Sequence, residues 1–280
     1  MKKIDLHIHT TASDGTFTPE EVVREASRLG LAAVAITDHD TAEGYPAAAA
    51  EGAKLGLEVV PGIEISTKFR AAVHILGYYI DVNSPALEEV LDWMHRDREE
   101  RNVKLCAMLR EQGVDIDNER MHARFGDFVG RPHFAEIMVE NGMARDVNDA
   151  FERLLNKNRP YFIPRQFLPI ERSVEIIREA GGIPVLAHPF QYRLDDAQLR
   201  ELIEHCMDSG LEGMECRYTG YDARQCAYLE SLAAEYGLVR TGGSDFHGAI
   251  KGDIRLGEGR GELEVPCAWL EELRSRRRKD

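Results

Sequence analysis

The sequence predicts an α/β barrel interrupted by a helical insertion, and three observations support this fold class. In the 280-residue chain, short β-like runs alternate with helix-like runs up to about residue 83. The same alternation resumes after residue 166. Between these parts no clear strand is found, and from Arg96 to Arg165 basic and acidic residues balance although the chain has a net charge of −14. We therefore expect a barrel in two parts, 1–99 and 166–280, with an insertion at 100–165.

Seven β-strands are expected to form the barrel. The first, Lys3–His9, alternates polar and apolar residues with the period of two that is typical of a strand. The other six expected strands are short β-like runs at 33–37, 57–61, 73–77, 183–187, 211–215 and 238–241. Because helix-like segments separate most of these runs, we expect parallel pairing and a closed sheet.

Helices are expected between most of the strands. Thr18–Glu21 is a capping box with proline in the first turn, and it predicts a helix that Gly30 ends. Further helices of the barrel are expected at 43–55, 170–180, 195–209 and 221–236. The insertion is expected to contain helices at 84–112, at about 131–141 and at about 146–156.

Composition and charge exclude several classes of protein. A hydrophobic content of 43% with 30% charged residues is ordinary for a globular chain and excludes disorder over most of it. No apolar run approaches the ~18 residues that span a membrane, and the N-terminal residues lack the apolar region of a signal peptide. We therefore expect a cytoplasmic protein without membrane association. The net charge of −14 disfavours general nucleic-acid binding, since phosphate contacts need a basic surface.

Histidines and carboxylates are concentrated where the expected strands end. His7 and His9 are two residues apart on the first strand and therefore point to the same face. Asp245 and His247 repeat this spacing near the C-terminus. Because the carboxyl ends of barrel strands converge on one face, these side chains are expected to meet there. The candidate metal ligands are His7, His9, Asp14, His39, Glu64, His74, His188, Asp245 and His247.

Nine such ligands predict a site for two or three divalent ions. Burying these imidazoles and carboxylates without partners would cost free energy, which bound ions offset. Nitrogen and oxygen donors without thiolate suit Mn²⁺, Zn²⁺ or Fe²⁺, and the donor set alone does not choose among them. Glu64 is placed to bridge two ions. With two or three ions the site becomes positively charged and attracts anions.

The motifs resemble the PHP (polymerase and histidinol phosphatase) family. The matching residues, in the order of the family motifs, are Asp5–His9 with Asp14, Thr37–Asp40, Pro61–Glu64, His74, His188–Pro189 and Ser244–His247. The resemblance implies a distorted (β/α)7 TIM-like barrel, the PHP fold, that holds two or three metal ions. It also implies a metal-dependent phosphatase that hydrolyses phosphate esters.

The resemblance further implies how the ligands are divided among the ions. A first ion would be held by His7, His9, Glu64 and Asp245. A second ion would be held by Asp14, His39 and His247, and a third by Glu64, His74 and His188. Asp38 and Asp40 are expected to orient ligands rather than to bind an ion. The expected catalytic residues are Asp14, His188 and His133.

Two segments of the insertion, 98–102 and 130–135, resemble the stand-alone family members that act on 3′,5′-nucleoside bisphosphates. The expected substrate-binding residues are Asp14, Arg98, Arg101, Asn102, Arg131 and His133. For Arg98 and Arg101 a solvated helix face is the alternative. Arg131 follows Gly130 at the start of an expected helix, where an anion is stabilised.

The resemblance thus implies that the 3′-phosphate is removed from adenosine 3′,5′-bisphosphate to give AMP. The sequence leaves open which group protonates the leaving oxygen. One alternative is a 5′→3′ exoribonuclease that acts on short RNA. Another is a histidinol-phosphate phosphatase, which the arginines disfavour because its substrate carries cationic groups. A small nucleotide and short RNA are the expected binding partners, and no protein partner is indicated.

Overall fold

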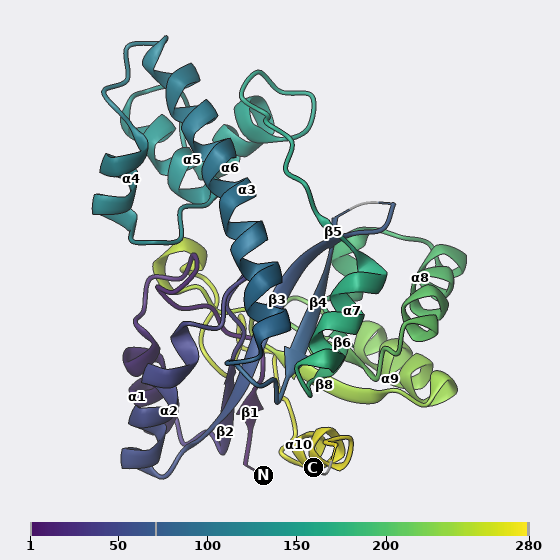
Figure 1. Ribbon diagram of the computed structural model, residues 1–280. Helices are drawn as coiled ribbons and strands as arrows, with labels where there is room; N and C mark the ends of the chain where they lie inside the picture. The colour runs from purple at the N-terminus through teal and green to yellow at the C-terminus, as the bar shows by residue number, and fades with distance from the viewer. Residues whose placement is uncertain (1, 71, 279–280) are drawn as a thin grey trace. The chain divides into compact units, whose positions relative to one another are not determined.

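The computed structural model describes residues 2–70 and 72–278 (Figure 1). The chain divides into two compact units, one formed by residues 1–89 with 167–280 and the other by residues 90–166. The boundary between residues 89 and 90 lies inside one continuous helix, α3 (Pro85–Arg110), and therefore does not coincide with the end of a helix. The expected insertion at 100–165 lies within the second unit, which starts earlier along α3.

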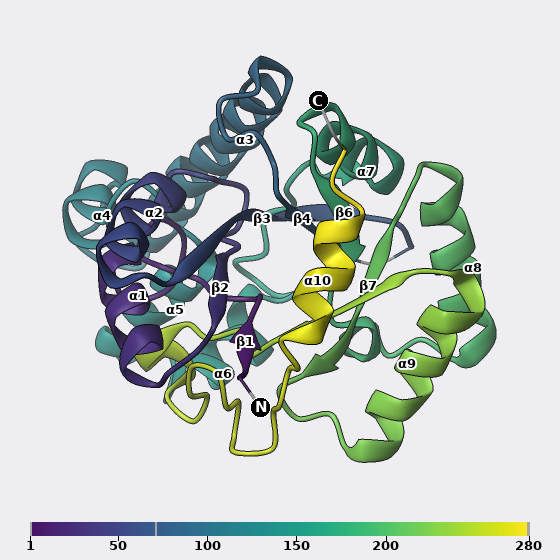
Figure 2. The same cartoon turned by 90° about the horizontal axis from the view of Figure 1, so that it is seen from below.

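The first unit is an almost closed barrel of seven strands (Figure 2). In the order of pairing the strands are β1 (Ile4–Asp5), β2 (Ala33–Ile36), β3 (Glu58–Lys68), β4 (Ala72–Tyr78), β6 (Ile183–Leu186), β7 (Gly213–Tyr218) and β8 (Val239–Gly243). A short further strand, β5 (Leu168–Pro169), pairs with β3. The chain around β1 joins the end of β8, since Leu6 N–H donates to the Gly242 carbonyl (3.1 Å). The expected barrel fold is confirmed.

Strand β4 departs from the expected parallel arrangement. It pairs antiparallel with both β3 and β6, with Ile75 opposite Ile65 on one side and Leu186 on the other. Only a few residues separate Lys68 from Ala72, whereas a parallel connection needs a crossover of a dozen or more. Strand β3 also continues to Lys68 instead of ending near residue 61, so Glu64 lies within a strand.

Five helices of the barrel unit lie close to the expected segments: α1 (Pro19–Arg28), α2 (Gly44–Leu55), α7 (Ile170–Glu179), α8 (Asp196–Asp208) and α9 (Ala223–Tyr236). A further helix, α10 (Ala268–Ser275), was not among those expected. At the start of α1 the Thr18 hydroxyl accepts from Glu21 N–H (3.2 Å), while the Glu21 carboxylate accepts from Thr18 N–H (2.8 Å). Helix α1 buries Val22 and Val23 completely against residues of β2. The helix forms because its apolar residues lie on one face that packs on the sheet and because its first turn is capped.

The second unit is helical and has its own core. It contains most of α3, together with α4 (Asn118–Phe125), α5 (Arg131–Glu140), α6 (Val147–Ala150) and a π-helical turn at Phe151–Leu155. Helix α4 was not expected; it begins at Asp117, whose carboxylate accepts from Arg120 N–H (2.8 Å). Leu109, Phe134 and Met138 are fully buried in the core of this unit.

Within the described residues, 2–70 and 72–278, no helix is both long enough and apolar enough to cross a bilayer.

Candidate metal centre

The structure brings the nine predicted ligands together at one end of the barrel. His7 and His9 follow β1, His39 follows β2, His188 follows β6, and Asp245 follows β8. The remaining ligands lie on strands β3 and β4 or in the loops that follow β1 and β8; they are Asp14, Glu64, His74 and His247. They form four overlapping groups, and within each group the possible donor atoms lie within 4.8 Å of one another. The barrel thus brings residues up to 238 positions apart in the chain into one group (His9 and His247).

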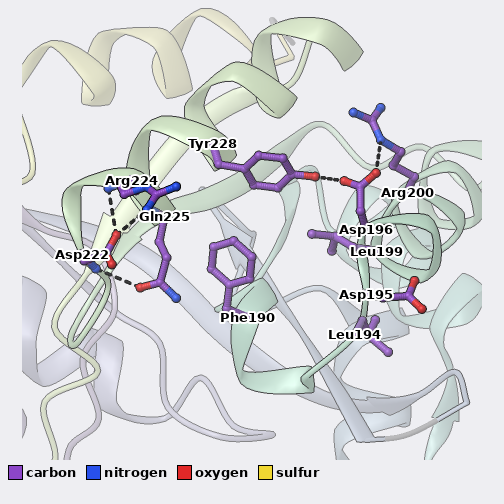
Figure 3. A pocket seen from close by; sticks show the side chains of 10 residues that line it. All are labelled: Phe190, Leu194, Asp195, Asp196, Leu199, Arg200, Asp222, Arg224, Gln225 and Tyr228. Carbon is purple, nitrogen blue, oxygen red and sulfur yellow. Dashed lines mark hydrogen bonds and ion pairs between the residues drawn. The ribbon is translucent and has the colours of Figure 1, made fainter.

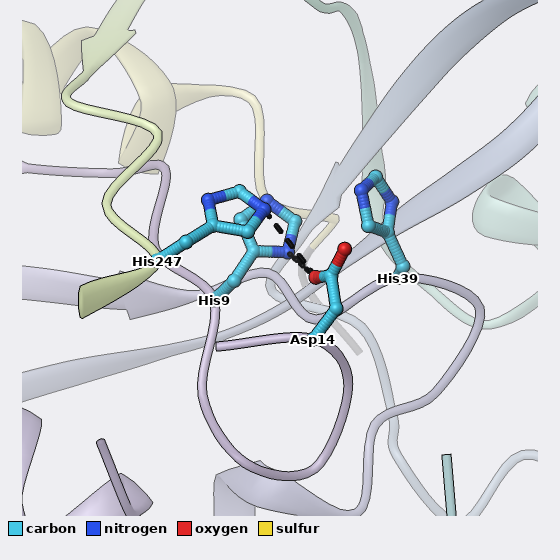
Figure 4. A group of neighbouring side chains, drawn as sticks. All are labelled: His9, Asp14, His39 and His247. Carbon is cyan, nitrogen blue, oxygen red and sulfur yellow. Dashed lines mark ion pairs between the residues drawn. The ribbon is translucent and has the colours of Figure 1, made fainter. Parts of the chain in front are cut away.

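One group consists of His9, Asp14, His39 and His247, whose side chains converge in Figure 4. Asp14 Oδ1 lies 3.3 Å from His247 Nε2 and 3.8 Å from His9 Nδ1. The rings of His9 and His247 are stacked with their centroids 4.0 Å apart. The resemblance implied only Asp14, His39 and His247 for this ion, and the geometry adds His9.

Glu64 belongs to two of the other three groups. Its Oε2 lies 3.4 Å from His7 Nε2, 3.2 Å from His9 Nε2 and 3.0 Å from His39 Nδ1. Its other oxygen, Oε1, lies 2.8 Å from His74 Nδ1 and 2.9 Å from His188 Nε2. The two oxygens of this buried carboxylate therefore serve two sets of imidazoles, which is the arrangement expected of a bridging ligand.

Several donor atoms at this centre are buried and have no hydrogen-bond partner. They are both ring nitrogens of His9, Nε2 of His7, Oδ1 of Asp14, Nδ1 of His39 and Nδ1 of His188. Buried polar atoms without partners are rare because they cost free energy. Donors bound at about 2.0–2.2 Å to a shared ion lie about 3–3.5 Å apart, close to the spacing seen here. The residues therefore fit divalent ions.

The carboxylates create a strongly negative environment around the imidazoles. Burial alone would lower the pKa of His9, but the nearby carboxylates of Asp245 and Glu64 outweigh it and raise the pKa to about 9. Burial also opposes ionisation of Glu64, yet its electrostatic interactions with the imidazoles of His39, His74 and His7 hold its pKa well below its usual range. The carboxylates are thus ionised at neutral pH, and a centre with such charges attracts cations.

Several residues that support the ligands were missed by the sequence analysis. Glu215 is fully buried at β7; one of its oxygens lies 3.0 Å from His7 Nδ1, and the other accepts from His188 N–H (2.7 Å). The hydroxyl of Tyr218 and the ammonium of Lys251 each donate to Asp245 Oδ2 at 2.6 Å. An acidic residue inside a buried apolar strand was the signal that could have identified Glu215.

The residues expected to orient ligands do so through the loops. Asp38 accepts hydrogen bonds from Thr10 N–H (2.6 Å) and Ser13 Oγ (2.6 Å), which fixes the loop that carries Asp14. The carboxylate of Asp40 accepts from Ser66 N–H (2.7 Å) and so connects the end of β2 with β3. Both residues hold the backbone from which ligands project.

Ser244, the residue before Asp245, is held by the carboxylate of Asp5 rather than by its neighbour. Its backbone N–H donates to Asp5 Oδ1 (2.9 Å) and its hydroxyl to Oδ2 (2.6 Å). Asp5, the first residue of the Asp5–His9 motif, is fully buried, and the sequence analysis assigned it no role.

The predicted substrate residues of the insertion all lie in the helical unit. The Arg98 guanidinium is buried and stacks 3.6 Å from the centre of the Phe128 ring. Arg101 Nε donates to the amide oxygen of Asn102 (3.0 Å), and the Asn102 amide donates to the Val129 carbonyl (3.0 Å). Asn102 therefore positions Arg101. Substrate binding by these residues stays a prediction.

Arg131 and His133 lie in the first turn of α5. Arg131 is exposed, and its guanidinium lies 5.7 Å from the centre of the Phe151 ring. His133 is buried, and its Nδ1 accepts from Gly130 N–H (3.0 Å). The proton of a neutral His133 is consequently on Nε2, which can donate to a phosphate oxygen.

A cluster of imidazole and carboxylate ligands at the carboxyl ends of barrel strands defines a metal-dependent hydrolase. The PHP domain family model matches residues 5–171, more than half of the chain. The protein therefore belongs to the PHP family.

Similar proteins agree on the chemistry and differ in substrate. The 5′-3′ exoribonuclease Rnm of Salmonella typhimurium is 34% identical over 271 residues, which cover 95% of this chain and 87% of the relative. A 3′,5′-nucleoside bisphosphate phosphatase of Chromobacterium violaceum is 32% identical over 260 residues, covering 92% and 91%. The crystal structure of a candidate metal-dependent phosphoesterase from Bifidobacterium adolescentis has a TM-score of 0.86 at 30% identity, covering 99% and 97%. The chain is a metal-dependent phosphoesterase.

Proposed function

We propose that the protein hydrolyses the 3′-phosphate ester of nucleotides that also carry a 5′-phosphate. The model substrate is adenosine 3′,5′-bisphosphate, and the products are AMP and phosphate. Mn²⁺ is the proposed ion, with Zn²⁺ and Fe²⁺ as alternatives. The metal centre would bind the phosphate that is cleaved, so the second phosphate of the substrate needs other cations. The observation that carries the proposal is a cluster of arginines in the helical unit.

Four arginines of this unit, Arg98, Arg101, Arg131 and Arg165, are close enough to influence one another. Burial lowers the pKa of Arg101 to about 9, and the positive charges of Arg165, Arg98 and Arg131 act in the same direction. The carboxylate of Asp97 opposes this effect, and its Oδ2 lies 3.5 Å from Arg165 Nε. Since Arg101 is still protonated at neutral pH, the cluster brings several positive charges together. A phosphate with two negative charges would neutralise it through charge-assisted hydrogen bonds.

The reaction would depend on this chain's own residues in three ways. The nine ligands would hold the ions. When bound, such ions lower the pKa of water and stabilise negative charge that develops on the phosphate. Asp38 keeps the loop of Asp14 in place, and Glu215 orients His7. His188, Asp14 and His133 are the residues proposed to handle protons or contact the phosphate during the reaction. The His133 Nε2–H is suited to this role, because Nδ1 is occupied by the backbone of Gly130.

A 5′→3′ exoribonuclease is the second candidate function, and the similarity to the Salmonella enzyme favours it. Both reactions can break the same kind of bond, the ester to the 3′-oxygen of a nucleotide that has a 5′-phosphate. They differ in whether the departing phosphate carries a further nucleoside. The same metal centre and the same arginines could therefore serve both activities.

The test is phosphate release from adenosine 3′,5′-bisphosphate with added Mn²⁺, with the products separated by chromatography. We expect AMP and phosphate, with AMP itself left intact. The same preparation is incubated with a 5′-phosphorylated RNA of five nucleotides. Release of nucleoside 5′-monophosphates from the RNA, without hydrolysis of the bisphosphate, would replace the first function by the second. Parallel reactions with Zn²⁺ and Fe²⁺ test the choice of ion.

The arginine cluster is tested by Arg131→Met, which changes its exposed member. We expect the preference for adenosine 3′,5′-bisphosphate over adenosine 3′-phosphate, measured as a ratio of kcat/KM values, to fall about 10- to 100-fold, because a charged hydrogen bond is lost. Arg124→Met is the matched control, since Arg124 is also exposed in this unit and pairs with Glu140 (2.7 Å). An unchanged ratio in Arg131→Met would remove the arginine from the proposal.

A further inference from the structure

A pocket of about 670 Å³ opens on the barrel unit (Figure 3). Its wall comes from the turn that follows β6 and from the first turns of α8 and α9. Phe190 and Tyr228 supply aromatic surface, and Leu194 and Leu199 add apolar surface. The proposed reaction has so far used none of these residues.

Phe190, in the pocket wall, is close to the metal ligand His188 in sequence and is related to it by a series of ring contacts. Phe190 comes two residues after His188, so their backbones are at most about 7 Å apart. Aromatic rings lead from the centre outwards. His188 contacts Tyr218 (centroids 5.4 Å apart), Tyr218 contacts Tyr221 (5.2 Å), and Tyr221 contacts Phe190 (5.3 Å). The turn that carries Phe190 thus begins at His188, a candidate ligand of the metal centre, and the inference takes the pocket to be within reach of a nucleotide whose phosphate binds the ions.

The two aromatic side chains of the wall are held in fixed positions. Tyr221 Oη accepts from Phe190 N–H (2.9 Å), which anchors the turn. The Tyr228 hydroxyl donates to the Asp196 carboxylate, which also accepts from Arg200 Nε (3.2 Å), as Figure 3 shows. The rings of Phe190 and Tyr228 are inclined by 30° with centroids 6.0 Å apart, and both are half-buried. They offer partly exposed faces that need no rearrangement before a flat ligand binds.

The polar groups of the pocket suit a neutral ring with hydrogen-bonding edges. Gln225 Oε1 accepts from Asp222 N–H (2.9 Å), so its NH₂ group is the part that can donate to a ligand. The pocket is lined by the carboxylates of Asp195, Asp196 and Asp222 and by the guanidinium groups of Arg200 and Arg224, so its charges nearly balance. Stacking surface with a few polar groups at the edge is the chemistry by which proteins bind nucleobases.

We propose that this pocket binds the nucleobase of the substrate by stacking on Phe190 and Tyr228. The inference rests on the proposed function in that the substrate is taken to be a nucleotide. Base stacking on an aromatic side chain tolerates any base, so the pocket contributes affinity without strong base selection. It also gives the protein a means to prefer nucleotides over other phosphate esters of similar charge.

The first test compares adenosine 3′,5′-bisphosphate with ribose 3,5-bisphosphate, which has the same phosphates and no base. For the wild-type protein we expect the ratio of kcat/KM values to favour the adenosine compound. We expect Tyr228→Ala and Phe190→Leu to lower this ratio about 5- to 100-fold, the range measured for loss of one stacking partner. Tyr236→Ala is the control, because Tyr236 lies on the same helix, outside the pocket wall, and binds Glu204 (2.8 Å). A ratio that is the same in Tyr228→Ala and wild type overturns the proposal.

A binding measurement separates this inference from the proposed function. Adenosine, which has no phosphate, is titrated into the wild-type protein and Tyr228→Ala, and binding is followed by chemical-shift changes or calorimetry. Weak binding that is lost in Tyr228→Ala supports the pocket even where no nucleotide is hydrolysed. Hydrolysis of the bisphosphate together with equal adenosine binding in both proteins leaves the proposed function intact and rejects the nucleobase pocket.

Discussion

At the scale of single residues, the metal centre depends on side chains that donate nothing to an ion themselves. Glu215 is the main example, because its two oxygens engage His7 Nδ1 and the backbone N–H of His188. This contact fixes the His7 tautomer with its proton on Nδ1 and leaves Nε2 directed at Glu64 and Asp245. A carboxylate behind a ligating imidazole also makes the imidazole a stronger donor.

We expect Glu215→Gln to weaken ion binding about 10- to 100-fold, the usual cost of losing such a partner. The amide keeps the size of the carboxylate, so the barrel should remain folded. Calorimetric titration of the metal-free protein with Mn²⁺ measures the affinity, and circular dichroism verifies the fold. Glu230→Gln is the matched control, since Glu230 pairs with Arg217 (2.9 Å) and touches no ligand in the contacts described. Equal affinities for Glu215→Gln and the control would show that Glu215 is structural only.

The sequence predicted the candidate ligands and the orienting residues Asp38 and Asp40, but it missed Glu215, Tyr218 and Lys251 for a physical reason. A ligand of this centre reveals itself by its type and by its place at the end of an expected strand, as with His39 or His188. Glu215, Tyr218 and Lys251 act through contacts with residues that are 208, 27 and 6 positions away, respectively. Such contacts follow from the closed barrel and have no local pattern.

At the scale of elements, the barrel closes where the chain of β1 meets the end of β8. A Cβ atom on Gly243 would lie 2.4 Å from both the backbone nitrogen and the Cβ of His7. No side chain fits there, and the close approach is what places His7 beside Asp245. The requirement for glycine at this position is therefore tied directly to the metal centre.

Gly243→Ala should consequently disturb the fold and the centre together. We expect the free energy of unfolding to fall by about 1–3 kcal/mol, the usual cost of overpacking, together with weaker Mn²⁺ binding. Thermal unfolding and metal titration measure the two effects. Gly252→Ala is the control, because its Cβ would lie 3.4 Å from the nearest atom, the Ala249 carbonyl oxygen. A stable Gly243→Ala with wild-type ion affinity would contradict this account of barrel closure.

The elements also show where sequence patterns fail. Each of the seven expected strands exists, because short β-like runs bounded by turns are a local signal. The expected parallel direction of β4 was wrong, because strand pairing depends on tertiary structure. The connection after Lys68 is too short for a crossover helix, and this could have indicated antiparallel pairing. Helix α4 was missed because its eight residues bury only Met121 and so lack a clear apolar stripe.

At the scale of the whole molecule, an acidic protein has to attract an anionic substrate. The chain carries a net charge of −14, so the substrate is repelled at long range unless positive charge is concentrated locally. Bound ions at the barrel and the arginines of the helical unit would supply it. Removing the ions would leave ionised carboxylates such as Glu64 and Asp245, which repel phosphate. The ions are thus expected to control both binding and catalysis.

The ions are also expected to contribute to the stability of the whole protein. The centre contains buried donor atoms without partners, among them both ring nitrogens of His9. Ions that bind only the folded state stabilise it by about 2.7 kcal/mol at a concentration 100 times the Kd. For a protein of this size we expect Tm to fall by roughly 5–10 °C after treatment with EDTA. Restoring Mn²⁺ should recover both Tm and phosphate release.

Asp14→Asn separates this effect from a general response to the chelator. The substitution keeps the side-chain size but removes a charged ligand of the group formed with His9, His39 and His247. We expect turnover to fall by more than about 100-fold, since losing an outer partner alone costs 10- to 100-fold. The Tm difference between EDTA and Mn²⁺ should shrink while the metal-free Tm stays near that of the wild type. His205→Ala, which changes a histidine paired with Glu171 (2.6 Å), should retain the full difference. An identical Tm with EDTA and with Mn²⁺ in the wild-type protein would contradict the view that ions stabilise the fold.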